Sequence, residues 1–488
     1  MKLDRQVENE GEVITPSRGR SSFLLLIVAW MVAGTLLSTP LADEIPLTAK
    51  ALLIAPPLLL STILLFLSPH DGVIAWGFIL TFFVTQTGFQ AQFGQLTTSA
   101  VEISLVAILT VLLIIHRFQG LNITFNIPGR GFLFVFIIYA TIRLMIGVMQ
   151  GDSVTMALSE YKGFILYPLM VYPLIAGFQS RRILGWAVTY LGLWYALVSA
   201  VGLFQFIANQ QIFYQGEVYR ASGDYGPINL FGITLAMVAV FLFGVAWKRN
   251  GEERSRPFLI ILGLFILAGA LTSLSRTVVV GFVAGFLVLL FFQRKLGLGI
   301  LFVLLLIGLL SFNLLPETVL TGAIERVFQM SDSSTLRREY YLISGLQAMR
   351  EFWLMGGGWG QGYWYIQGYG LVPSGGIPWY HNDYLNLVVQ SGIVGLLTYL
   401  GFWGSVIWAA IKFLRQAKQS PLNRYVLGSL AALTGLLAAA LFEHVLWRSD
   451  IAGLVGWTAG VLLAALRIAR DERILAEAGL RSGNKSPP

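Results

Sequence analysis

Residues 228–247, INLFGITLAMVAVFLFGVAW, contain no charged side chain, and they decide the fold class of this 488-residue chain. A helix needs about 20 mostly apolar residues to cross the hydrocarbon core of a bilayer. Lys248 and Arg249 follow directly, and basic residues of this kind flank the cytoplasmic ends of membrane helices. The stretch therefore predicts a transmembrane helix that ends on the cytoplasmic side.

The composition extends this interpretation to the whole chain. Hydrophobic residues make up 56% of it and charged residues 12%, whereas soluble domains are about 45–50% apolar and about 25% charged. This balance excludes a soluble enzyme, a nucleic-acid-binding protein and a disordered scaffold. Because the chain has no cysteine, disulfides, a thiolate nucleophile and a cysteine metal site are excluded too. We expect an all-α, polytopic integral membrane protein.

The apolar segments predict about 12–14 transmembrane helices, of which the third and the tenth are short. The candidates lie at 22–38, 50–68, 72–86, 99–116, 131–149, 163–178, 184–207, 228–247, 257–273, 277–292, 297–315, 393–413, 425–444 and 451–467. We expect the first to be a retained helix and not a cleaved signal sequence, because no small-x-small cleavage site follows it cleanly.

The basic residues predict which side each loop faces. If the N-terminus is cytoplasmic, strict alternation of fourteen helices puts 23 of the 33 basic residues on the cytoplasmic side, as the positive-inside rule requires. The other ten are Lys50, Arg143, Lys162, Arg220, Arg276, Arg326, Arg337, Arg338, Arg350 and Arg448. We expect a cytoplasmic tail 1–21, eleven helices in 22–315, an extracytoplasmic loop 316–392, three helices in 393–467 and a cytoplasmic, polar tail 468–488.

The long outer loop is the most informative part of the chain. It has 77 residues (392 − 316 + 1), and a segment of that length needs some structure of its own. We expect a helix near 335–354, tight glycine turns in 355–376 and a polar-aromatic segment at 378–386. The glycines of 356–362 are not a nucleotide loop, since no Lys-Ser/Thr pair follows them. The many Tyr and Trp residues suit either an interfacial aromatic belt or contacts with sugar rings.

Ionisable residues within the apolar segments lie toward the extracytoplasmic half. They are Glu102, Arg143, Glu443 and His444, and such residues are functional candidates because burying a charge in lipid is costly. A proton or ion pathway would instead need charges near the midplane. For Glu443 and His444 the alternative is that they end a helix and reach water, whereas Arg143 needs a partner or an anionic ligand.

Four outer arginines and one outer histidine are the strongest site candidates. Guanidinium groups bind phosphate oxygens through two parallel hydrogen bonds, so Arg220, Arg276, Arg337 and Arg338 suit a lipid-linked phosphate or pyrophosphate. Pairing with Asp224, Asp332 or Glu339, or with lipid headgroups, is the alternative. A histidine imidazole can accept a proton near neutral pH, which makes His381 a candidate, although a single loop histidine is more often structural than catalytic.

Four motifs in this order resemble a known family. They are Arg220-x-x-Gly223 with Asn229, then Leu274-Ser275-Arg276, then Ser334-Thr335-Leu336-Arg337-Arg338-x-x-Tyr341 with Gly358-Trp359-Gly360, and finally His381-Asn382-x-Tyr384-Leu385. The chain resembles the O-antigen ligase superfamily, which includes O-antigen and exopolysaccharide polymerases. The last two motifs cover about 330–410, and the earlier helices are similar in hydropathy and order alone.

The resemblance implies a metal- and cofactor-independent glycosyltransferase of the membrane-embedded GT-C kind. Such an enzyme transfers a glycan from polyprenyl (undecaprenyl) pyrophosphate to a sugar hydroxyl, on a glycan or a lipid A-core acceptor, at the outer face of the bacterial inner membrane. It implies His381 as general base and Arg220 with one of Arg337 and Arg338 on the pyrophosphate. Further supporting candidates are Arg276, Asn382, Tyr384 and Arg143.

Two other functions stay open at this stage. One is a multispan transporter of an inorganic anion such as bicarbonate, for which the arginines would bind the anion. The other is an assembly role without catalysis. Fourteen helices favour a polymerase, and twelve favour a ligase.

Overall fold

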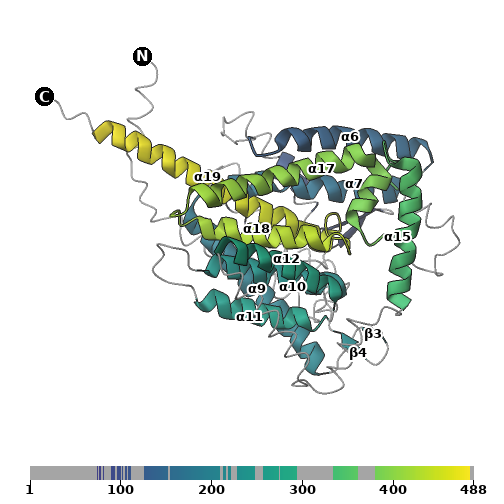
Figure 1. The fold of residues 1–488 in the computed structure, drawn as a ribbon, viewed down its shortest axis with the longest axis horizontal. Helices are drawn as coiled ribbons and strands as arrows, with labels where there is room; N and C mark the ends of the chain where they lie inside the picture. The colour runs from purple at the N-terminus through teal and green to yellow at the C-terminus, as the bar shows by residue number, and fades with distance from the viewer. Residues whose placement is uncertain are drawn as a thin grey trace, which may run out of the picture.

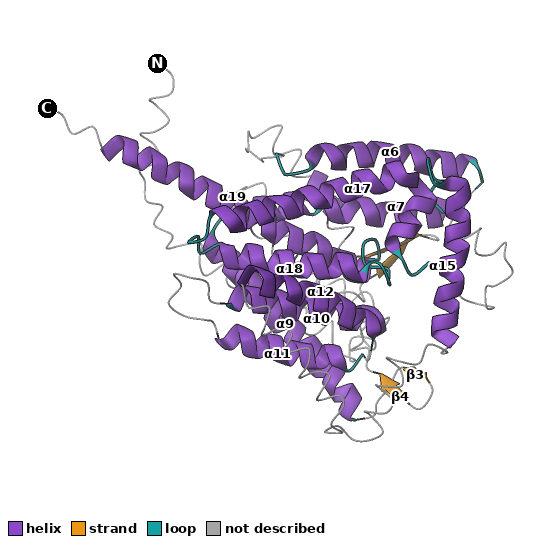
Figure 2. Cartoon of the chain, in the orientation of Figure 1, coloured by secondary structure: helices purple, strands orange, loops and turns teal. Residues whose placement is uncertain are grey.

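The computed structural model describes residues 126–151, 154–208, 213–215, 218–220, 228–247, 257–273, 275–293, 333–360 and 380–483, with two short strands and scattered positions between 74 and 110. These residues form an assembly of packed helices (Figures 1 and 2). Six of the helices are long and apolar enough to cross a membrane, which confirms the all-α, polytopic fold class. The segments 22–38, 50–68 and 297–315 lie outside the described residues, so the total of 12–14 helices stays a prediction.

The stretch that decided the fold class forms the central helix α10, Ile228–Ala246. It packs against α11 (Pro257–Leu271), α12 (Arg276–Gln293) and α18 (Asn423–Ala439), and nearly all of its side chains are buried. Small residues allow this packing: a Cβ added to Gly244 of α10 would lie 2.4 Å from the Cα of Gly428 of α18. Such close backbone approach is how membrane helices gain packing energy without a hydrophobic effect between them.

Further helices surround this centre. Helix α9 (Arg181–Ile207) packs on α11, α6 (Arg130–Met149) packs on α17 (Asp383–Gln416), and α19 (Ser449–Gly483) packs on α7 (Val154–Leu169) and α8 (Val171–Gly177). The outer faces carry exposed apolar side chains, which suits contact with lipid. On α6 these are Phe132, Phe134, Val135, Ile138, Ile142 and Met145, and on α11 they are Phe258, Ile261, Leu264 and Phe265.

Two predicted boundaries were wrong. Helix α17 begins at Asp383, ten residues before the expected start at 393, and α7 begins at Val154, nine residues before 163. Both extra segments carry polar side chains, which hide them from a hydropathy argument. The side chains are buried with partners: Gln390 Nε2 donates to Glu160 Oε2 and, at 2.6 Å, to Asn386 Oδ1.

Helix α19 continues to Gly483, through most of the residues expected as a polar tail. Its polar end has ion pairs at helical spacing, Arg467 with Asp471 and Arg473 with Glu477, and Arg181 of α9 bonds to Glu472. Pairs four residues apart stabilise a helix once it has begun. Two short hairpins lie between predicted membrane helices: β1 (Gln90–Phe93) with β2 (Leu96–Ser99), and β3 (Phe213–Gln215) with β4 (Val218–Arg220).

Helix α15 (Ser333–Phe352) confirms the helix expected near 335–354, and in Figure 1 it runs across the direction of α17. Tyr341 and Ala348 of α15 pack on Tyr380, Leu385 and Val389 at the start of α17. A Cβ on Gly345 would lie 2.5 Å from Leu385 Cδ2, so the absence of a side chain there lets α15 approach α17. This contact sets Arg338 beside His381.

The glycine run after α15 forms tight turns within 355–360, and the rest of the expected turn region, 361–376, lies outside the described residues. Gly356, Gly358 and Gly360 have φ of 78°, 112° and 93°, values that glycine adopts far more readily than other residues. Gly357 N and Gly358 N donate to the carbonyls of Val389 and Gln390. Those carbonyls are available because α17 is kinked at Gly392, whose φ is 65°. The run therefore fastens the end of α15 to the kink in α17.

Candidate active site

The site is centred on Glu443, in the turn between α18 and α19. His381 Nδ1 lies 2.9 Å from Glu443 Oε1, and Arg338 Nη2 lies 3.2 Å from Oε2. Asn229 Nδ2 of α10 donates to the same Oε2 at 2.8 Å. One carboxylate thus joins residues from α10, α15, the start of α17 and the α18–α19 turn.

The exposure of these groups separates their roles. The side chains of His381 and Arg338 are 29% and 31% exposed, whereas that of Glu443 is 6% exposed. A substrate can therefore reach the histidine and the arginine, while the carboxylate lies behind them. Burial by itself would raise the pKa of Glu443, but the hydrogen bond from His381 and the charge of Arg338 hold that pKa well below its ordinary value. Glu443 is accordingly ionised.

An ionised Glu443 fixes the tautomer of His381. A carboxylate only accepts hydrogen bonds, so His381 Nδ1 carries the hydrogen and donates it to Oε1. In the neutral imidazole Nε2 then has the free lone pair. His381 thus has the arrangement of a general base whose outer nitrogen accepts a proton while the inner one is held by a carboxylate.

The backbone at His381 is also unusual. Its φ is 49°, the one positive value at a non-glycine residue in the part of the chain that the structure describes. Positive φ costs free energy at such a residue and persists where the surroundings enforce it. Tyr380 before it is buried, and Asn382 after it caps α17 by accepting from Tyr384 N and Leu385 N at 3.1 and 3.0 Å. These two neighbours hold the histidine at the helix end.

A second histidine–carboxylate pair supports the first. His444 Nδ1 lies 3.2 Å from Asp383 Oδ1, and Asp383 Oδ2 accepts from Val445 N and Leu446 N, both at 2.7 Å. Asp383 thereby ties the α18–α19 turn to the start of α17. The rings of His381 and His444 are 5.1 Å apart. Burial lowers the pKa of His444, against the hydrogen bond with Asp383, which favours a neutral ring beside His381.

The structure shows plainly where most predicted site residues lie. It brings His381 and Arg338 together on Glu443. Arg337 and Arg220 belong to α15 and β4, and Arg276 is the first residue of α12; their substrate contacts stay predictions. Tyr384 donates its hydroxyl to Leu437 O of α18 at 2.6 Å, and Asn382 is the helix cap, so both have structural partners.

Arg143 lies apart from the site. Its Nη2 donates to the carbonyl of Gly356 in the glycine run, which supplies the partner that a buried arginine requires. Trp359 in the same run is fully buried and donates from Nε1 to Ala140 O at 2.9 Å. Neither the aromatic-belt nor the sugar-contact interpretation fits that tryptophan.

The sequence did not predict that Glu443 lies at the centre of the site. Glu443 and His444 are 5% and 1% exposed, so the idea that they end a helix and reach water was wrong. Asn229 and Asp383 were not predicted as site residues, although both stand inside or beside the quoted motifs. The signal that was present was an ionisable residue at the end of an apolar segment; its partner, 62 residues away in sequence, was not apparent.

A cation is one further occupant to consider. Among the described residues, His381, Glu443 and His444 each offer a ligand atom, all within 4.8 Å of one another. A metal there would have to replace the hydrogen bond from His381 and lie near the charge of Arg338. The hydrogen bonds from His381, Arg338 and Asn229 already satisfy the carboxylate, so the residues present do not favour a metal.

Comparison with protein families found a match to part of the chain. Residues 261–400 match a family model described as O-Antigen ligase, a range that contains Arg276, Arg337, Arg338 and His381 and ends before Glu443. A search of curated proteins found no match. With six helices long and apolar enough to cross a membrane and this matched segment, the chain is similar to O-antigen ligases over the part that carries Arg338 and His381.

Proposed function

We propose that the protein is a glycosyltransferase that moves a glycan from polyprenyl pyrophosphate to a sugar hydroxyl at the outer face of the inner membrane. The acceptor is a second glycan or a lipid A-core. The observation that carries the proposal is the shared carboxylate of Glu443, which holds a proton acceptor, His381, next to a phosphate-binding side chain, Arg338. The reaction needs those two functions a few ångströms apart.

The chemical step follows from these roles. The acceptor hydroxyl oxygen attacks the anomeric carbon of the donor glycan, and His381 Nε2 takes the hydroxyl proton. The bond between the anomeric carbon and the pyrophosphate oxygen breaks, and the leaving polyprenyl pyrophosphate keeps the electron pair. Negative charge grows on that oxygen in the transition state, so a fixed guanidinium stabilises it more than the ground state.

We assign Arg338 to the pyrophosphate, with Arg220, Arg337 and Arg276 as its supporting contacts. Arg338 is half-exposed and bonded to Glu443 on one side, which leaves other N–H groups of its planar fork to bind phosphate oxygens. The carboxylate of Glu443, which is itself held by Asn229, fixes the position of Arg338, so little conformational entropy is lost when the donor binds.

The test uses purified protein and a short glycan on polyprenyl pyrophosphate, with and without a lipid A-core acceptor. His381→Ala should lower turnover by about 10²–10⁴-fold, the usual contribution of a general base. Arg338→Gln should lower it by about 10²-fold or more. Arg350→Gln is the matched control, because Arg350 lies exposed on the same helix.

The products also distinguish the two activities of the superfamily. A ladder of longer lipid-linked glycans without acceptor indicates a polymerase, and a single shifted acceptor band indicates a ligase. If His381→Ala protein accumulates in the membrane and turns over as fast as the parent, the catalytic assignment is wrong.

A further inference from the structure

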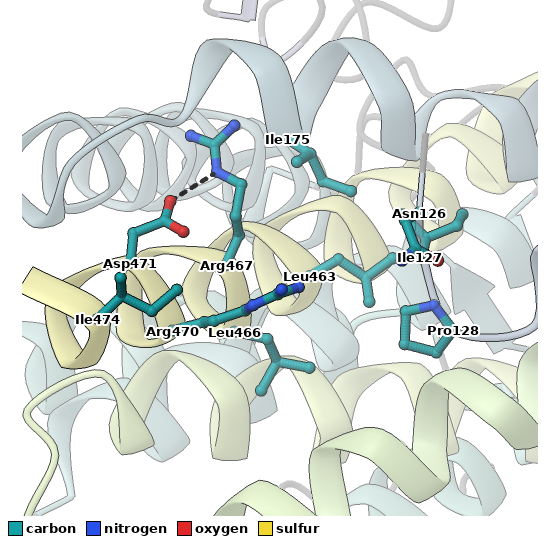
Figure 3. Close-up of a pocket in the computed structure, with 10 residues that line it drawn as sticks. All are labelled: Asn126, Ile127, Pro128, Ile175, Leu463, Leu466, Arg467, Arg470, Asp471 and Ile474. Carbon is teal, nitrogen blue, oxygen red and sulfur yellow. Dashed lines mark ion pairs between the residues drawn. The ribbon is translucent and has the colours of Figure 1, made fainter. Parts of the chain in front are cut away.

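A cavity lies along α19, beside α8 and the segment before α6. It has a volume of about 630 Å³, within the roughly 300–1,000 Å³ range of small-molecule sites. Figure 3 shows residues of α19 facing a short segment before α6 and one residue of α8 across the cavity. The lining residues are Asn126, Ile127, Pro128, Ile175, Leu463, Leu466, Arg467, Arg470, Asp471 and Ile474.

The helix directions place this cavity at the opposite membrane surface from the candidate active site. Helix α19 begins at Ser449, just after the turn that carries Glu443 and His444. Arg467 is 18 residues further along (467 − 449), which corresponds to about 27 Å of helix at 1.5 Å per residue. The hydrocarbon core of a bilayer is about 30 Å thick. The cavity therefore lies at the depth of the headgroups of the other leaflet.

The lining of the cavity suits a ligand that is an anionic amphiphile. Arg467 and Arg470 are three residues apart and share one face of α19, and Asp471 is the one acidic residue in the lining, so the cavity has a net positive charge. The remaining wall is mostly apolar, with Leu463, Leu466 and Ile474 on the helix. A free phosphate would gain nothing from those side chains, whereas the first methylenes of an acyl chain would.

Arg467, which lines the cavity, has unused hydrogen-bonding capacity. Arg467 Nε lies 3.8 Å from Asp471 Oδ2, beyond the range of a hydrogen bond. It is buried and has no hydrogen-bond partner among the described residues. A buried donor of this kind costs free energy unless a ligand satisfies it, and a phosphate oxygen is the acceptor for which guanidinium is best suited.

The part of α19 that follows the cavity indicates that the bound phosphate belongs to a lipid. Ile474 and Leu475 are 52% and 72% exposed, next to Arg470 and Arg473. Exposed apolar side chains beside basic ones suit the depth of the membrane interface, and basic clusters there attract anionic lipids. We propose that this cavity binds the phosphate headgroup of an anionic phospholipid, through Arg467 and Arg470, at the membrane surface opposite His381. The inference does not depend on the proposed glycosyl transfer.

The test is native mass spectrometry of the purified, delipidated protein with added phosphatidylglycerol or phosphatidylcholine. We expect preferential binding of phosphatidylglycerol. Removing one basic residue from a lipid-facing site corresponds to about a fivefold loss of affinity, so Arg470→Gln should weaken phosphatidylglycerol binding about fivefold. Arg467→Gln should do the same or more; because Arg467 is partly buried, the exposed Arg470 is the safer first variant.

The matched control is Arg473→Gln. Arg473 is 79% exposed and pairs with Glu477 four residues along, on the same helix but outside the cavity lining. Its variant should bind phosphatidylglycerol as the parent does. Equal binding of the two lipids, or equal losses in Arg470→Gln and Arg473→Gln, would overturn the proposal. A second measurement compares the thermal midpoint of the protein with inorganic phosphate at millimolar concentration and with phosphatidylglycerol. An equal rise with both would also overturn the proposal, since the apolar wall would then play no part.

Discussion

Glu443→Gln is the sharpest test of the site, because it changes one oxygen to nitrogen and keeps the size of the side chain. In the native protein Oε2 accepts from Arg338 Nη2 and Asn229 Nδ2, and Oε1 accepts from His381 Nδ1. A glutamine amide has one oxygen and one NH₂ group, so it cannot accept on both sides.

The contacts predict which way the glutamine turns. Two side-chain donors, one of them charged, face the Oε2 position at 2.8 and 3.2 Å. The Oε1 position faces one side-chain donor, His381 Nδ1 at 2.9 Å, and the more distant backbone N of His444 at 3.4 Å. The amide oxygen should therefore point to Arg338 and Asn229, and its NH₂ group to His381. To accept from that NH₂, His381 Nδ1 must lose its hydrogen, which moves to Nε2. The nitrogen that should accept the proton of the substrate is then blocked.

The expected loss is the whole contribution of the general base, about 10²–10⁴-fold in kcat, or about 2.7–5.5 kcal/mol of activation free energy. KM should change far less, because Arg338 keeps its position. The assay is the glycan-transfer reaction on polyprenyl pyrophosphate, with the amount of membrane-inserted protein measured in parallel. A Glu443→Gln enzyme within about threefold of the parent in kcat, at equal protein level, would refute the tautomer argument.

Three further predictions follow from the same contacts. Gly392→Ala should lower the free energy of unfolding by about 1–3 kcal/mol or more, because φ is 65° there and a Cβ would lie 2.2 Å from Leu354 O; Gly404→Ala on the same helix, with nothing within 4 Å, should be neutral or mildly stabilising in thermal unfolding. The pKa of Glu443 is held below its ordinary value of 4.5, so its ionised form stabilises the fold above that pH and the contribution is lost as the pH falls below it. The difference in thermal midpoint between the parent and Glu443→Gln should therefore be constant above about pH 5.5 and shrink below about pH 4.5, and a difference that grows in acid would contradict this sign. Treatment with EDTA should leave glycan transfer unchanged; a loss of tenfold or more that zinc restores would show that His381, Glu443 and His444 hold a metal.

Hydropathy predicted helices well where a segment is uniformly apolar and poorly where polar groups have partners inside the protein. Helix α10 ends one residue from its expected boundary, because all of its residues except Asn229 and Thr234 are apolar. The start of α17 was missed because Asp383, Asn386 and Gln390 are polar, yet each is buried against a partner. A sequence window records their polarity and has no means to record those partners.

The candidate site shows the same division. His381 and Arg338 were predicted from residue type, the side of the membrane they were expected to face and a motif. Their common partner was not, since Glu443 is separated from His381 by the whole of α17 and α18 and its role depends on where those helices bring it.

The sequence alone determined that this chain is a membrane-embedded bundle with a polar, glycine- and aromatic-rich segment that carries its chemistry. Composition and hydrophobic length are enough for that, because a bilayer accepts few alternatives to apolar helices. The tertiary structure decided which groups act together. It placed Glu443 between a histidine and an arginine, it turned Asp383 into the tie between α17 and the α18–α19 turn, and it opened a basic cavity at the other end of α19. Hydrogen bonds and ion pairs act over about 3 Å, and only the packing of helices distant in sequence brings their partners within that range.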